Sequence, residues 1–559
     1  MKNIFKLAAV CAILIMMPTA CDLTPINVNP NQPSAEVDYN LNDARLASAF
    51  RTSLPAIEGD DEQRVKSLMV DFYAQMLDGG IFSTRNYLMN EDWNQRMYRR
   101  VQNAIASLNI VIRNLSERQE DFARAIAVAK IWRVYVESIG IDYFGPIPFA
   151  KYSEVEENPP YMSVENAYNE FFKELEEAVA LLDKGGTFPI FNDAASDIIY
   201  RNDDGKWKRF ANSLRLRLAI RLSEVKPELC KEQAAKAIAS GVMESSADNA
   251  YIPPKADGGW GQDYNYVMFQ ITWGGPLKMT TTMEKLLTGI GGTPWPAGIV
   301  NHRSGLSGAT PVAVSTHPET VDPRGPVMFD PGYENGAWRG YPDGMYGSLI
   351  TGEYASNVQW AELGTLIRNG ARYTSRPYDV FLYEEVCFLK AEAALKGFIT
   401  GDAKSEYEKG VRTSFTTWGV GSLADEYLAS TDKNLAGTST NFDDNQGPGN
   451  TPIEKIITQK YFALFPDMSM EAWSDHRRLN LPRFDVPMFR DELLYNNSDR
   501  DFLKPANFIR RVQYPQNEIQ INKAEYDKGV QLLGGRDVVS TPIWWDLGKN
   551  YCTSAPSAN

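Results

Sequence analysis

Apolar side chains recur at intervals of three and four residues through much of the first half of the chain. The clearest stripe begins after Ser163, runs from Val164 to Leu182, and stops before the glycine pair at 185–186. Serine is a favoured helix N-cap and glycine a common helix terminator, so this pattern predicts a helix over 163–182. The same periodicity predicts further helices over 43–57, 62–78, 91–115, 118–139 and 206–224.

Two later stripes, over 378–395 and 402–418, are separated by Gly397 and Gly401 and form another pair. Amphipathic helix pairs joined by short turns are typical of tetratricopeptide-like solenoids, although here the pairs are unevenly spaced and the full repeat signature is absent. The predicted fold class is therefore mainly α. Tetratricopeptide-like helix pairs are expected to pack against a second half of irregular structure.

That second half is predicted from a change in composition between residues 255 and 360. The stretch holds 18 of the 41 glycines, 9 of the 32 prolines and 5 of the 12 tryptophans, and only 277–287 has a helical pattern. Disordered segments are poor in tryptophan, so we expect ordered loops packed on the helices. Long ordered loops usually carry function, and we expect a ligand site here.

Charge and histidine content narrow the function. The formal net charge of −14 argues against a nucleic-acid partner, whose phosphates require a basic surface. The chain has three histidines, none of them in a recognisable catalytic motif. No metal or phosphate motif points to a cofactor, and none is expected. Calcium at the acidic turns 202–205 or 443–445 stays open, although such turns are commoner without a metal.

The N-terminus predicts export and a lipid anchor. Lys2 and Lys6 flank the start of an apolar run, 7–17, which ends in Pro-Thr-Ala before Cys21. This is the pattern of a signal peptide, predicted over 1–20, and small residues before a cysteine match a bacterial lipobox. Acylated Cys21 would hold the protein on a membrane without a spanning helix. An ordinary secreted protein is the alternative. Residues 21–38 are predicted as an extended spacer and 39–559 as a single domain.

Five sequence blocks then follow one another in the order found in one known family. They are Trp132 to Phe149 with its Phe-Gly-Pro-Ile-Pro turn, Trp207 to Arg217, Leu389 to Ala394, Glu471 to Arg478, and Arg510 to Asn522. Together they resemble the SusD/RagB family of nutrient-binding outer-membrane lipoproteins of Bacteroidetes. The resemblance implies a SusD-like fold, a location on the cell surface through the lipid anchor, and a TonB-dependent, SusC-like transporter as partner.

Most charged residues of these blocks are predicted to be structural. Glu392 lies in an alanine-rich helix, and Asp475 is followed by Arg477 and Arg478. Such groups more often form buried ion pairs that join helices than perform chemistry. The same role is expected for Arg510 with Glu518, and a framework role for Arg215 and Arg217.

Two classes of function stay open. The first is a non-catalytic protein that binds a nutrient polymer, most simply an oligosaccharide, with a peptide ligand as a variant found in the same family. The second is a glycoside hydrolase, which needs two carboxyl groups about 5–10 Å apart. No motif among the 71 acidic residues points to such a pair. We therefore expect binding without catalysis.

Sugar rings have apolar C–H faces and polar rims, so their sites combine aromatic platforms with a few polar groups. The loop-rich stretch also contains Trp295, and for any one of its tryptophans packing is as plausible as ligand contact. Trp260 and Trp338 are favoured as platforms because each is flanked by glycine and a polar group. The ligand-binding residues predicted from the loop-rich stretch are Trp260, Asp263, Trp273, Trp338, Arg339, Tyr341 and Trp360; the resemblance implies a second contribution from 79–93, with Tyr87 and Trp93.

Overall fold

The computed structural model describes residues 41–54, 61–78, 90–149, 158–253, 277–301, 311–344, 359–364, 377–485 and 508–547. Over these residues helices predominate and the strands are two to four residues long. The predicted mainly α fold class is confirmed. The signal peptide, Cys21 and the spacer 21–38 lie outside the described residues, so the predictions for them stay predictions.

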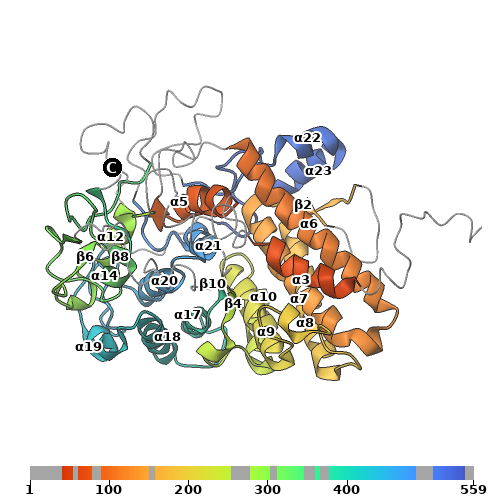
Figure 1. Ribbon diagram of the computed structural model, residues 1–559, viewed down its shortest axis with the longest axis horizontal. Helices are drawn as coiled ribbons and strands as arrows, with labels where there is room; N and C mark the ends of the chain where they lie inside the picture. The colour runs from red at the N-terminus through yellow and green to blue at the C-terminus, as the bar shows by residue number, and fades with distance from the viewer. Residues whose placement is uncertain are drawn as a thin grey trace, which may run out of the picture.

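The longest helices stand side by side at one end of the molecule (Figure 1). Helix α7 (Gln119–Phe144) lies between α6 (Glu91–Ser116) and α8 (Val164–Lys184), and α3 (Asn42–Thr52) packs on α6. From Ala123 onward α7 is buried on nearly all its faces, because it is the central helix of this layer. The pair α9 (Asp204–Arg221) and α10 (Pro227–Ser240) then packs on α8.

A second group of helices occupies the middle of the molecule. The pair α17 (Tyr383–Leu395) and α18 (Ala403–Thr417) packs together, α20 (Pro452–Ala463) lies against both, and α17 also contacts α9. Helix α21 (Ser469–Leu479) follows α20 and lies beside the N-terminal π-helix η2 (Glu62–Val70). The remaining helices of this part and of the C-terminal segment are α5 (Asp71–Tyr73), α19 (Ala424–Ala429), α22 (Gln516–Ile521) and α23 (Lys523–Leu533), with short 3-10 turns at Ala194–Ser196, Ser246–Asp248 and Gly421–Leu423.

The loop-rich lobe, residues 277–301 and 311–344, lies at the end of the molecule opposite α6–α8 (Figure 1). Its core is an antiparallel sheet in the order β1 (Leu77–Asp78), β5 (Lys278–Met279), β9 (Glu362–Leu363), β8 (Phe329–Asp330). The lobe also contains α12 (Thr281–Leu287), the turn η7 (Ile290–Gly292), α14 (Gly325–Met328) and the hairpin of β6 (Val300–Asn301) with β7 (Val312–Ala313). As predicted, its described residues are ordered against the helices.

Two small antiparallel pairs complete the strands. Strand β2 (Ile147–Pro148) pairs with β3 (Tyr161–Met162), and β4 (Ala250–Ile252) pairs with β10 (Tyr378–Phe381). The predicted helices over 378–395 and 277–287 are therefore wrong at their starts, where β10 and β5 lie. Each strand pairs with a segment that is distant in sequence, which a local periodicity does not detect.

The other predicted helices are confirmed to within a few residues at most ends. Helix α7 runs five residues beyond the predicted 139, because it ends where Gly145 takes a φ of +86° and Pro146 follows. Helix α3 ends at Thr52, short of the predicted 57. The predicted helix over 62–78 is helical only to Tyr73, after which the chain turns into β1.

Buried charges join these helices. Arg478 forms a bidentate pair with Glu392, both N–O distances being 2.6 Å, and also bonds Asp475. Arg217 holds Glu385 in the same manner at 2.8 and 2.6 Å. The predicted structural role of these groups is confirmed. A buried pair is strongly destabilised when one partner is removed, so these contacts fix the relative positions of α9, α17 and α21.

Two of the predicted pairings are wrong. Arg510 pairs with Asp546 at 3.1 Å, whereas Glu518 accepts hydrogen bonds from Tyr161 and Asn522. Spacing in the sequence suggested a local partner, but the C-terminal segment folds back and brings Asp546 to the arginine. The second is the pairing of Arg477 with Asp475: the Arg477 guanidinium group packs against the rings of Trp473 and Trp545.

Candidate functional site

Five predicted site residues lie outside the described residues: Cys21, Tyr87, Trp260, Asp263 and Trp273. The other five, Trp93, Trp338, Arg339, Tyr341 and Trp360, are described, and all but Trp93 belong to the loop-rich lobe or to the segment 359–364 paired with it. Their placement separates rings that pack from groups that reach the surface.

Trp338 and Trp93 are packing residues in this structure. Trp338 is 2% exposed, and its indole N–H donates to the Phe329 carbonyl at 3.1 Å. Trp93 lies in the first turn of α6, which the Asn90 side chain caps, and is 7% exposed. A ring this deeply buried offers no face to a sugar. Of the two roles considered for Trp338, platform and packing, the structure shows packing.

Three of the predicted residues form one cluster. The Arg339 guanidinium lies 4.0 Å from the centroid of the Trp360 ring, and Tyr341 meets that ring edge-on at 5.2 Å. Both rings are buried and Arg339 is half-buried. Beside them, Glu284 accepts the Gly340 N–H at 2.8 Å, and burial raises the pKa of its carboxyl group. The cluster therefore presents the partly exposed Arg339 guanidinium group, supported from below by the Trp360 ring.

In the loop-rich lobe, one described aromatic pair reaches the surface, and neither of its members was among the predicted site residues. The half-buried indole of Trp295 stacks on the exposed imidazole of His317, with centroids 4.8 Å apart and planes inclined by 17°. The backbone N–H of Trp295 donates to the Glu319 carbonyl at 2.9 Å, which holds the two chain segments together, and Trp338 contacts the Trp295 indole edge-on at 5.1 Å. Trp295 stands between Pro294 and Pro296, the one local sign that its backbone is extended and fixed.

The Trp295 side chain also has an unmatched donor. Its indole N–H is buried and has no hydrogen-bond acceptor among the described residues. The neighbouring His317 Nδ1–H donates to the Pro318 carbonyl at 2.8 Å, within its own exposed loop. The pair therefore exposes apolar ring surface on a loop, which is the kind of surface on which the C–H face of a sugar packs.

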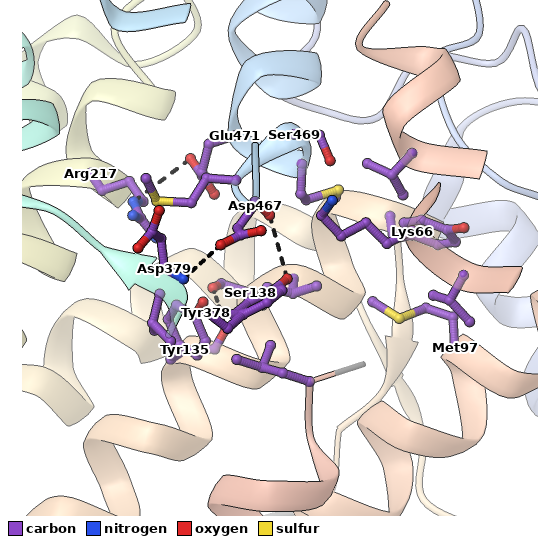
Figure 2. A pocket seen from close by; sticks show the side chains of 18 residues that line it. Lys66, Met97, Tyr135, Ser138, Arg217, Tyr378, Asp379, Asp467, Ser469 and Glu471 are labelled. Carbon is purple, nitrogen blue, oxygen red and sulfur yellow. Dashed lines mark hydrogen bonds and ion pairs between the residues drawn. The ribbon is translucent and has the colours of Figure 1, made fainter. Parts of the chain in front are cut away.

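A pocket in the helical part has a different character. It lies where α7, β10, η2 and the start of α21 meet (Figure 2) and has a volume of about 70 Å³. A cavity of about 150 Å³ accommodates benzene, so a pyranose does not fit here and only a few water molecules do. Its labelled lining residues are Lys66, Met97, Tyr135, Ser138, Arg217, Tyr378, Asp379, Asp467, Ser469 and Glu471.

Two of the carboxylates at this pocket, those of Asp467 and Glu471, are engaged in structural contacts. Asp467 accepts the Asp379 N–H at 2.9 Å, and Glu471 pairs with Arg221 at 2.7 Å. Burial alone would raise the pKa of Glu471, but Arg221 and Arg217 outweigh it and lower that pKa. A general acid needs a raised pKa and access to substrate. Glu471 has neither, so the pocket does not fit the glycoside hydrolase hypothesis.

A wider groove, of about 300 Å³, lies between α8, α9 and α10. Its walls are charged: Arg215 bonds Glu176 at 2.8 Å and Gln233 at 2.8 Å, which confirms the framework role predicted for Arg215. Phe172, the aromatic residue of its lining, is 3% exposed. The groove offers no aromatic face to a sugar.

In the part of the chain that the structure describes, no three side chains of the His, Cys, Asp and Glu types come together to hold a metal ion. In the acidic turn 202–205, Asp203 caps α9 and Asp204 pairs with Arg124, so both carboxylates have structural roles. None of the described helices has the length and apolar character needed to cross a bilayer.

Comparison with known proteins identifies relatives for nearly the whole chain. Residues 39–515 match the SusD-like family, described as starch-binding and associating with the outer membrane. A SusD homologue of known structure from Parabacteroides distasonis is 56% identical, with 92% of this chain and 100% of that chain covered and a TM-score of 0.86.

More distant structures share the fold. A SusD homologue from Bacteroides vulgatus is 26% identical, with 92% of this chain and 99% of that chain covered and a TM-score of 0.71. A chitin-binding SusD homologue from Flavobacterium johnsoniae is 24% identical, with the same coverage and a TM-score of 0.70, and shows likeness of fold alone. No curated protein matches the chain.

Proposed function

The chain belongs to the SusD-like family, and from this premise we propose that it binds a carbohydrate at the cell surface without altering it chemically. The family description names starch, and a relative that shares the fold binds chitin. Both ligands are polymers of hexopyranose rings, whose C–H faces pack on aromatic side chains. An oligosaccharide of this type is the ligand we propose.

The observation that carries this proposal is the stacked pair of Trp295 and His317. Among the described tryptophans of the loop-rich lobe, Trp295 has its ring partly at the surface, whereas Trp338 is buried. An aromatic face covering roughly 60–80 Å² of sugar contributes about 1.5–2 kcal/mol at 25 cal/mol per Å². The partly exposed Arg339, together with the predicted Trp260, Asp263, Trp273 and Tyr87, would supply the remaining contacts.

Binding without turnover is supported by the state of the described carboxylates near cavities. At the helical pocket, Glu471 pairs with Arg221 and Asp467 accepts a backbone N–H, and the pocket is too small for a sugar ring. We therefore propose no catalytic residue.

The test is a binding panel with purified protein and three ligand classes: starch-derived oligosaccharides, chitin-derived oligosaccharides and peptides. We expect saturable calorimetric binding to a glycan, and no new reducing ends after prolonged incubation. Binding to peptides alone would favour the peptide-binding variant. New reducing ends that disappear on changing one carboxylate would favour a glycoside hydrolase.

We further propose that the protein is anchored in the outer membrane through acylated Cys21 and passes its ligand to a TonB-dependent, SusC-like transporter. The family description places such proteins at the outer membrane, and a surface binder needs a route for its ligand across that membrane. Crosslinking in intact cells, followed by purification through a tag on this chain, should recover one transporter of this class. Recovery of none would contradict the proposed partnership.

A further inference from the structure

The loop between α19 and α20 folds around a buried lysine. Lys455 lies in the first turn of α20 and is 0% exposed. Its ammonium group donates to the Asp444 carbonyl at 2.5 Å, the Asn450 carbonyl at 2.7 Å and the Asn450 side-chain oxygen at 2.7 Å. An ammonium group has three N–H donors, so this arrangement satisfies all of them.

A lysine is unexpected at this position. The N-terminus of a helix carries a partial positive charge that disfavours cations, and a buried charge is costly unless it is compensated. Among the described residues, no carboxylate oxygen lies within ion-pair distance of Lys455. Burial lowers the pKa of Lys455 to about 8, while Asp444 and Glu454 act in the opposite direction, so the group is still an ammonium ion at neutral pH. Neutral oxygens of the loop hold this charge.

The loop positions those oxygens through its own hydrogen bonds. The Asn450 amide donates to the carbonyl and the carboxylate of Asp444 at 2.8 and 2.9 Å. The Ser439 N–H and hydroxyl both donate to the Asn450 side-chain oxygen, at 2.7 and 2.9 Å. Gly449, with a φ of +82°, turns the chain where a Cβ would lie 2.5 Å from the Ala436 carbonyl oxygen. Converging carbonyl and carboxamide oxygens are the ligands that hard cations prefer.

We propose that residues 439–450 form a cation-binding loop, that the ammonium group of Lys455 is its built-in cation, and that shortening this side chain opens a site for an ammonium-sized monovalent cation. Three protein oxygens are too few for Ca²⁺, which takes about six to eight oxygen ligands. The acidic turn 443–445, considered for calcium from the sequence, is thus part of a loop whose cation the chain itself supplies.

Residues 434–438, which precede this loop and bond it through the Thr438 hydroxyl and the Gly449 carbonyl, contact the loop-rich lobe, and α19 lies beside that lobe in Figure 1. The Asn434 amide donates to the Leu286 carbonyl at 3.2 Å, and the Leu435 N–H donates to the Lys285 carbonyl at 3.2 Å. Both acceptors belong to α12, which leads through η7 to Trp295. The proposed cation site therefore stabilises the segment that precedes the exposed aromatic pair. The proposal does not depend on whether the protein binds a carbohydrate.

The test compares thermal unfolding of the wild type and of Lys455→Ala in sodium, ammonium and tetramethylammonium chloride at equal ionic strength. We expect Lys455→Ala to melt below the wild type in sodium chloride. Ammonium should raise the melting temperature of Lys455→Ala, because the ion fits the space that the lysine side chain leaves and donates to the same oxygens. Tetramethylammonium has no N–H donor and should not. The wild type should respond alike to all three salts.

Two variants serve as controls. Lys404→Ala removes a half-exposed lysine that pairs with Asp443 of the same loop, and it should show no ammonium-specific effect. Lys455→Met keeps the apolar stem, removes the charge and fills the space, so it should melt early in every salt. If Lys455→Ala does not fold in sodium chloride, its refolding yield in the three salts replaces the melting curve. Wild-type stability of Lys455→Met, or equal effects of all three salts on Lys455→Ala, would overturn the proposal.

Discussion

The guanidinium group of Arg477 lies 3.7 Å from the ring centroid of Trp473, one turn earlier on α21. Trp545 covers the same cation at 4.7 Å, and the arginine donates to the carbonyl oxygens of Asp142 and Arg510 at 2.6 and 3.0 Å. Since the indole N–H of Trp473 donates to the Ile509 carbonyl, α21 holds the C-terminal segment against the end of α7. These contacts of Arg477 are all with other parts of the protein, so its role is to stabilise the fold.

Replacing Arg477 with lysine should destabilise the fold. A lysine ammonium cannot present a planar face to two indoles and cannot reach both carbonyl oxygens in the same geometry. Hydrogen bonds to charged groups contribute about 1.5–3 kcal/mol each, so we expect a loss of at least that size in urea unfolding. Arg118→Lys is the matched control, because Arg118 also lies over an aromatic ring but is half-exposed. Equal unfolding free energies for the two variants would contradict this role.

Helices with a single buried stripe were predictable from the sequence because their signals are local. In α8, the Ser163 side chain caps the helix and Gly185 ends it with a φ of +67°. Helix α21 was not predicted, because nearly every side chain from Ser469 to Leu479 is buried and its charges have partners inside the protein. Helices α10, α20, α22 and α23 were likewise not assigned from periodicity.

The candidate site was predictable only as a region. Composition placed several tryptophans in one stretch, but whether a given ring packs or faces solvent depends on residues that are distant in sequence. Trp338 is buried against the segment that contains Phe329, whereas Trp295 is paired with His317 on an exposed loop. Nothing in the sequence around Trp338 indicates that its ring is buried, and its glycine and arginine neighbours favour exposure.

Stability should depend on pH through Glu137. This residue of α7 is 0% exposed, both its carboxyl oxygens have no hydrogen-bond partner among the described residues, and Arg133 approaches only to 3.6 Å. Burial raises the pKa of Glu137 to about 8, with Arg133 opposing and Glu174 reinforcing the shift. Between the ordinary value of 4.5 and about 8, the folded protein holds a proton that the unfolded chain has lost. Its contribution to stability therefore falls as pH rises through this window.

Glu137→Gln removes this titration while it keeps the shape of the side chain. Relative to the wild type, its melting temperature should rise progressively between pH 5 and pH 8, roughly the window of the shifted group. Glu170→Gln, at a surface position, serves as the control and should show no such trend. Melting curves of Glu137→Gln and wild type that stay parallel across this range would contradict the assignment.

The lipid anchor predicted from the sequence has a direct test. Metabolic labelling with radioactive palmitate should mark the wild type and leave Cys21→Ala unlabelled, because acylation requires the cysteine sulfur at the cleavage point. The variant should also leave the membrane fraction or remain uncleaved. Equal labelling of both proteins would exclude Cys21 as the modified residue.

The last prediction concerns two tryptophans in contact, Trp295 and Trp338, whose ring centroids are 5.1 Å apart. Trp295→Ala should melt near the wild type, because its ring is partly at the surface, but should lose the stacking area for a sugar. At about 1.4 kcal/mol per tenfold change in affinity, that loss predicts roughly a tenfold or larger rise in the dissociation constant. Trp338→Ala should behave in the opposite way, since removing a buried tryptophan costs about 3–5 kcal/mol of stability.

Calorimetric titration with the glycan found in the binding panel, together with melting curves, separates these outcomes. Trp338→Ala is titrated well below its melting temperature, so that a fall in affinity does not simply report unfolding. His317→Ala completes the series: it removes the exposed member of the pair and should weaken binding while leaving the melting temperature almost unchanged. If the wild type binds a glycan but Trp295→Ala and His317→Ala bind it equally well, the ligand contacts lie elsewhere. In that case the carbohydrate function would stand, and the proposed role of this aromatic pair would be wrong.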